Sequence, residues 1–257
     1  MTATTPTRTT SGTTRWLRLA GWQVWGYVII LGCFLLAAAV IAAVVLTVVA
    51  RSTTPTISAL QFAQQAAPWF LFGVAIHYCT SWLGPHVVAG LPRRSFVKAA
   101  VVAAAGGAAL GALGLVVLLF AERWIYGLLG WSAGADSGRV LATQAPLLPY
   151  LWGLFLLLFL AALTGLVVGL SYVRLGTVAT FLLPLTLSPL LLGGLFAFDT
   201  ATMFVPAVIR IEGLPVSWLT GPGSGVAGAL VGLALVGAAL VAIHLQARRI
   251  PIRSPRA

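Results

Sequence analysis

Long apolar runs separated by short polar gaps dominate the hydrophobic pattern of this chain. A helix that crosses about 30 Å of hydrocarbon needs about 20 apolar residues, and six runs have roughly this length. The first and last are nearly uninterrupted, whereas the second holds polar residues and a Gly84–Pro85 pair near its end. We therefore expect an all-α fold, a polytopic transmembrane helix bundle. Its six spans are predicted at about 26–50, 66–88, 98–120, 147–171, 177–198 and 222–246.

The charges in the gaps predict how these spans are oriented. When the N-terminus is placed in the cytoplasm, eleven of the fifteen Lys and Arg residues lie inside, as the positive-inside rule requires. An even number of spans then puts the basic tail, 247–257, in the cytoplasm as well. The outer gaps receive the other four basic residues and all four acidic residues: Arg51, Arg123, Arg139, Arg210, Glu122, Asp136, Asp199 and Glu212.

Composition excludes most soluble classes. Hydrophobic residues make up 60% of the chain and charged residues 7%, whereas a soluble domain has about 25% charged residues. The net charge of +11 is spread over short gaps rather than along one face. We therefore expect membrane lipid, and no nucleic acid, as a partner.

Composition also suggests where the protein resides. Arginine is strongly preferred over lysine, with Lys98 as the single lysine, and Ala, Gly and Val are abundant, which suggests a GC-rich bacterial genome. Residues 1–14 are polar, and the apolar run after them is too long for a signal-peptide core. We therefore expect no cleavable signal, and a multi-pass protein of the bacterial cell (inner or plasma) membrane.

Catalytic motifs are absent from the sequence. It has no G-x-x-x-x-G-K-[ST] phosphate loop and no H-E-x-x-H pattern, and no two acidic residues share a span. Cys33 and Cys79 lie in apolar runs and form no Cys-x-x-Cys motif. We expect no enzyme activity, no metal site and no cofactor in this chain.

Three histidines are candidates for other roles. His77 lies near the middle of the second span, where an ionisable group is a candidate for contact with substrate or protons. The alternative, which we favour, is an inert neutral imidazole bonded to a neighbouring helix. His86 and His244 lie near predicted cytoplasmic ends, where we expect them to meet headgroups or water.

Prolines and glycines indicate the shapes of the helices. Pro184 and Pro189 flank Ser188 inside the fifth span, as either a bend alone or a bent wall beside a pathway. The apolar segment 199–221 predicts a short re-entrant or interfacial helix on the outer side. Small residues recur every four positions, which predicts packing within one bundle in preference to a dimer face; they are Ala103, Gly107, Gly111, Gly165, Gly169, Gly228 and Gly232.

Three polar elements stand on the predicted cytoplasmic side. The loop after the second span carries a Gly-x-x-Arg-Arg-x-Phe string, formed by Gly90, Arg93, Arg94 and Phe96. A short turn after the fourth span contains Arg174 and Gly176. The N-terminal segment, 1–25, is basic and rich in tryptophan, with Arg15, Trp16, Arg18, Trp22 and Trp25.

Taken together, this arrangement resembles the ABC-type-2 permease subunits, the membrane halves of a class of ABC exporters. In that family a similar string, G-(V/T)-(S/T)-R-R-x-F, marks the loop that meets the ATPase; here Leu91 and Pro92 precede the arginines instead. The resemblance implies that segment 1–25 contains an interfacial elbow helix. It also implies that the string and the elbow couple ATPase closure to the helices, with Phe96 filling a pocket of the partner.

The resemblance further implies partners and a function. A separate ABC ATPase subunit would bind ATP and Mg, and a second permease subunit, identical or homologous, would complete the pathway. The uncharged interior disfavours a cargo such as a sugar phosphate and fits a lipid-like, peptide or amphipathic cargo better. Three alternatives remain open: an ion- or proton-coupled carrier with His77 as its relay, a membrane-embedded enzyme, and a non-transporting accessory or immunity protein.

Overall fold

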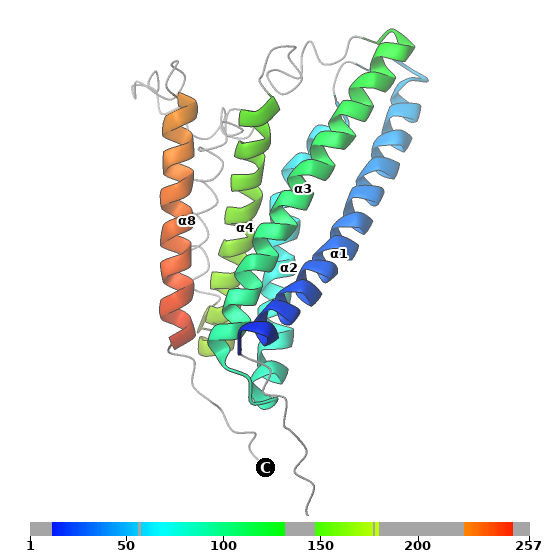
Figure 1. The fold of residues 1–257 in the computed structure, drawn as a ribbon. Coiled ribbons are helices and arrows are strands. Elements are labelled where there is room, and N and C mark those ends of the chain that lie inside the picture. Colours follow the sequence, from blue (N-terminus) through cyan, green and yellow to red (C-terminus); the bar gives the residue numbers. More distant parts are fainter. Residues whose placement is uncertain (1–11, 56–57, 132–146, 177, 180–223, 249–257) are drawn as a thin grey trace, which may run out of the picture.

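The described part of the chain is built entirely from long helices (Figure 1). The structure is a computed structural model that describes residues 12–55, 58–131, 147–176, 178–179 and 224–248. No strand occurs in these ranges, which confirms the all-α class. The predicted fifth span and the outer segment 199–221 lie outside the described residues, apart from residues 178–179. The helices are α1 (Gly12–Val49), α2 (Leu60–Val88), α3 (Arg93–Leu129), α4 (Leu147–Leu175) and α8 (Ser224–Arg248).

Among the described residues, four helices are long and apolar enough to cross a membrane: α1, α3, α4 and α8. Helix α2 is as long as α4, at 29 residues, but glutamines and histidines interrupt its apolar sequence, and it is not one of the four. The apolar helices support a membrane protein with transmembrane helices. The count of six spans and the orientation of the chain stay predictions.

Helices α1 and α3 exceed the thickness of a bilayer. They contain 38 and 37 residues, or about 55 Å each at 1.5 Å per residue, against about 30 Å of hydrocarbon. Helices of this length tilt or extend beyond the lipid. The two pack against each other and are inclined relative to α8 (Figure 1).

The expected elbow is the first part of α1. Helix α1 begins at Gly12 and continues without a break to Val49, so residues 12–25 form no separate helix. Helix α1 contains no proline, and its glycines after Gly12 are Gly21, Gly26 and Gly32. A single glycine lowers helix stability by only about 1 kcal/mol. An interfacial position for residues 12–25 stays a prediction.

Helix α4 is the centre of the described bundle. It packs against α2, α3 and α8, and every residue from 160 to 170 is buried. In the apolar 18-residue stretch of α4 that could cross a membrane, 83% of the residues are buried inside the protein. In the corresponding stretch of α1 the share is 11%. Helix α1 therefore lies at the periphery, and its outward face, which includes Leu36, Val40 and Val44, is exposed.

Glycines allow the helices to approach closely. A Cβ atom at Gly165 on α4 would lie 2.3 Å from the carbonyl oxygen of Phe72 on α2, and one at Gly107 on α3 would lie 2.6 Å from the ring of Tyr27 on α1. Real Cβ atoms do not come this near, so a side chain at Gly107 would displace the Tyr27 ring and one at Gly165 would push against the α2 backbone. The prediction that the small residues of α3 and α4 pack inside one bundle is confirmed.

Candidate functional site

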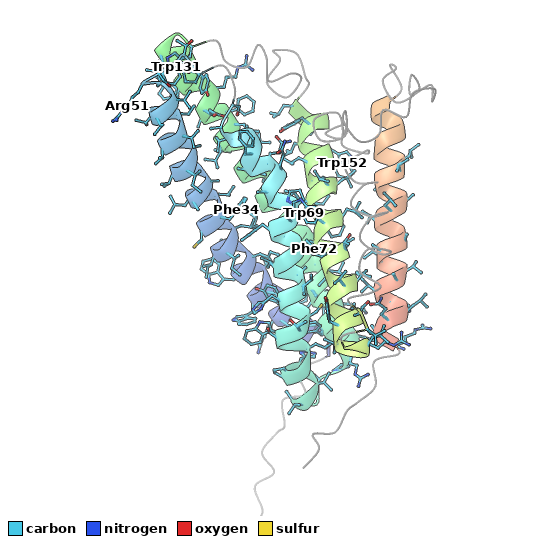
Figure 2. The ribbon with its side chains drawn as sticks, turned by 180° about the vertical axis from the view of Figure 1, so that it is seen from behind. Phe34, Arg51, Trp69, Phe72, Trp131 and Trp152 are labelled. Carbon is cyan, nitrogen blue, oxygen red and sulfur yellow. The ribbon has the colours of Figure 1, made fainter. Side chains whose placement is uncertain are left out.

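Most basic side chains of the described residues lie at one end of the bundle. The start of α1, the α2–α3 turn and the ends of α4 and α8 all lie there (Figure 1). The opposite end of the bundle carries Arg51 and Trp131, both labelled in Figure 2. Glu122 and Arg123 lie near it, in the last turns of α3. We call the first end the basic end. Its basic residues are Arg18, Arg93, Arg94, Lys98, Arg174 and Arg248, of which Arg93 and Arg174 are partly buried and the others exposed.

The α2–α3 turn has a defined backbone geometry. Helix α2 ends at Val88, and Gly90 adopts the left-handed conformation, with φ of 73°. The Leu91 N–H donates to the His86 carbonyl at 3.3 Å, and the Gly90 N–H to the Val87 carbonyl at 3.0 Å. The 6→1 bond closes the helix in the manner of a Schellman motif, in which glycine avoids the steric penalty of positive φ.

Helix α3 starts directly after this turn. Pro92 is its N-cap residue, with an extended backbone, φ of −69° and ψ of 134°. Proline suits this place because its missing N–H would have no partner inside the helix. The arginine pair thus forms the first positions of α3: Arg94 is exposed, and Lys98 one turn later is exposed too.

A buried histidine links the two sides of the turn. The His86 Nε2 atom lies 3.1 Å from the Ser95 Oγ and 3.3 Å from the Pro92 carbonyl oxygen. The imidazole is only 9% exposed, so the expectation that His86 meets headgroups or water is wrong. His244 is exposed on α8.

Phe96 of the predicted string is a core residue. Its side chain is 1% exposed and packs in the main apolar cluster of the bundle, with its ring centroid 5.4 Å from that of His86. In this structure the ring therefore supports the turn from inside and does not project toward a partner.

The other predicted polar elements lie near the turn. At the start of α1, Arg18, Trp22 and Trp25 are exposed, and the Trp22 ring packs edge-on against Trp82 of α2 with centroids 4.8 Å apart. Trp16 is partly buried, and of Arg15 the structure describes the helical backbone alone. At the end of α4, Gly176 has a φ of 61° and closes the helix through its N–H to the Tyr172 carbonyl at 2.9 Å.

The candidate pathway residues are only partly described. His77 is exposed near the middle of α2, and its Nδ1 lies 3.3 Å from the Ser81 Oγ. Thr80, also exposed, donates to the backbone carbonyls of Ile76 and His77. Pro184, Ser188 and Pro189 lie outside the described residues.

Among the buried polar residues that the sequence did not single out, Glu122 and Gln23 differ most in their hydrogen bonding. Glu122 on α3 is 3% exposed, and its carboxylate accepts hydrogen bonds from the Ser58 hydroxyl and the Ala59 N–H. Gln23 on α1 is 1% exposed, and neither polar atom of its side chain has a hydrogen-bond partner. In the sequence Glu122 stands beside Arg123 and Gln23 beside Trp22, so no local pattern marks either side chain as buried.

Comparison with known proteins adds no family. No protein-family model, no curated protein and no solved structure matches this chain.

Proposed function

We propose that this chain is the membrane permease subunit of an ATP-driven ABC exporter and forms half of a transmembrane pathway in a bacterial cell membrane. A second permease subunit, identical or homologous, supplies the other half. A separate ABC ATPase subunit binds ATP and Mg and docks on the basic end, which faces the cytoplasm.

The observation that carries this proposal is the construction of the α2–α3 turn. It is closed by backbone hydrogen bonds and joined across by His86, and it presents Arg94 and Lys98 at the surface. Closure of this kind is common at helix ends, so the proposal rests on the exposed Arg94 and Lys98 that the turn holds at the basic end. The start of α1 and the end of α4, the other elements implied by the resemblance, lie at the same end (Figure 1).

Docking on this end would depend on charge and on shape. Exposed ion pairs contribute only about 0.2–1 kcal/mol each, so the arginines set orientation more than affinity. Phe96 is unsuited to anchor the partner because it is buried. We therefore assign the contact surface to the exposed residues Ala89, Gly90, Arg94 and Lys98.

A site-specific cross-link tests this proposal. A photo-crosslinking amino acid at Lys98 should capture an ATPase subunit in cells that express the whole transporter. The matched control is the same amino acid at Arg51, which is exposed at the opposite end and should capture no ATPase. Absence of an ATPase adduct at Lys98, or equal capture at both positions, would contradict the proposal.

An ion- or proton-coupled carrier is the second candidate function, and the exposed His77 with its contact to Ser81 is the observation that favours it. In that case His77→Ala should abolish transport. A non-transporting accessory or immunity protein would retain its function in the same variant.

A further inference from the structure

The His86 side chain hydrogen-bonds across the α2–α3 turn from the α2 side. It belongs to the last turn of α2, and its Nε2 reaches both the Pro92 carbonyl, at 3.3 Å, and the Ser95 hydroxyl, at 3.1 Å. Pro92 and Ser95 belong to the N-cap and the first turn of α3. The imidazole therefore ties the end of one helix to the beginning of the next.

The directions of these hydrogen bonds follow from their partners. The Pro92 carbonyl can only accept, and it already receives the Ser95 hydroxyl at 2.5 Å and the Ser95 N–H at 2.9 Å. Since the serine proton points to Pro92, the serine oxygen is left to accept from histidine. The Nε2 atom must then carry a proton and donate, which fixes the protonated nitrogen of the ring.

The surroundings make this arrangement rigid. His86 is nearly buried, and the Phe96 ring lies against it. Loss of the acceptor of a buried donor is destabilising, so these hydrogen bonds favour one position of the ring. The acceptor shared by His86 and Ser95 is the carbonyl of Pro92, the residue directly before Arg93 and Arg94.

We infer that His86 is a positioning residue: by fixing the Pro92 carbonyl and the Ser95 hydroxyl, it sets the direction in which the arginine pair leaves the α2–α3 turn. Its role in presenting these arginines to an ATPase rests on the proposed function. The effect of His86 on the conformation of the turn does not depend on the proposed function. The effect on the turn and the role in docking are therefore tested separately.

Spin labelling tests the effect on the turn. In the background protein the exposed Cys33 is replaced by serine and the buried Cys79 is kept. Spin labels are attached at Ala89→Cys on the turn and at Leu245→Cys on α8. The labelled protein is measured in lipid nanodiscs. Pulsed electron–electron double resonance should give a narrow distribution of distances between the two labels. The variant His86→Leu should lose this narrow distribution, while His86→Gln, which keeps an N–H donor, should restore it.

Controls separate positioning from general damage. His77→Leu removes an exposed histidine from the same helix and should leave the distribution unchanged. Ser95→Ala, which removes the hydroxyl between His86 and Pro92, should broaden the distance distribution. If His86→Leu fails to fold, Ser95→Ala takes its place as the test. A distribution as narrow as the unmodified protein's in both His86→Leu and Ser95→Ala would overturn the inference.

Purification of the same variants tests the link to docking. An ATPase that co-purifies with the unmodified protein should be lost from His86→Leu and retained by His86→Gln. If it stays bound to a variant with a broadened turn, the role of His86 in docking is wrong. If the unmodified protein brings down no ATPase while His86→Leu broadens the turn, the proposed function fails and the positioning role stands.

Discussion

The Glu122 carboxylate on α3 accepts the backbone N–H of Ala59 at 2.8 Å, across 63 positions of sequence. The Leu60 N–H, 3.4 Å away, and the Ser58 hydroxyl donate to the same carboxylate. Ala59 is the N-cap residue of α2 and offers no side-chain acceptor of its own. A glutamate from another helix thus does the work of an N-cap, where its negative charge also meets the positive end of the helix dipole.

Removal of this carboxylate should destabilise the protein. Glu122→Ala leaves two backbone donors and one hydroxyl at a buried site without their acceptor, which costs about 1–3 kcal/mol. We expect a lower unfolding temperature in detergent, measured by circular dichroism. Glu122→Gln keeps one acceptor oxygen and should lose less. An Ala variant as stable as the unmodified protein would show that the carboxylate does not cap α2.

The close approach of α2 and α4 predicts intolerance at Gly165. A methyl group there would meet the Phe72 carbonyl oxygen, and overpacking of this kind costs about 1–3 kcal/mol. Gly165→Ala should therefore unfold at lower temperature. Gly73→Ala on α2 is the matched control, because a Cβ there has no atom within 4 Å, and it should cause no loss. Equal effects of the two changes would argue against the packing described.

The unpartnered amide of Gln23 predicts a stabilising substitution. A buried polar group without a hydrogen bond costs about 1–3 kcal/mol. Leucine, which is branched and one bond shorter, carries no such penalty. Gln23→Leu should therefore raise the unfolding temperature. Gln23→Glu, which would bury a charge at the same site, should lower it. A destabilised leucine variant would mean that the amide is hydrogen-bonded in the membrane, for instance to a water molecule.

The orientation of the bundle can be measured by cysteine labelling. In a Cys33→Ser background, Ser52→Cys follows α1 and Ala89→Cys lies in the α2–α3 turn, and both positions are exposed. With the basic end in the cytoplasm, a membrane-impermeant maleimide should label Ser52→Cys in intact cells. Ala89→Cys should react only after permeabilisation. The reverse pattern would contradict the orientation that the charge distribution predicts.

Helices could be predicted from the sequence because lipid demands long apolar runs, but their ends could not. Glu122 and Arg123 were expected to end the third span near residue 120, yet α3 continues to Leu129. The reason is that Glu122 is satisfied by donors 62–64 positions away, which no local pattern reveals. Helix α1 was expected to begin after an elbow, and no residue between Gly12 and Val49 forces a break.

At the candidate site, too, some features follow from the local sequence and others depend on contacts between residues of different helices. The turn at Gly90 can be predicted from the local sequence, because Gly90 ends α2 and Pro92 begins α3. The burial of Phe96 and the contacts of His86 depend on how α2 and α3 fold back on each other, and the polar character of histidine suggested the opposite. The sequence singled out the loop, whereas the group that holds it in place emerged only from the packing.

The most direct test of the central claim is purification of the protein from its native membrane in mild detergent, followed by mass spectrometry of what accompanies it. We predict a stoichiometric soluble ATPase, recovered in smaller amount when Arg94 is replaced by glutamate and in unchanged amount when Arg51 at the opposite end is replaced in the same way. A folded preparation that contains no ATPase would contradict the account and turn attention to His77 and a carrier or accessory role.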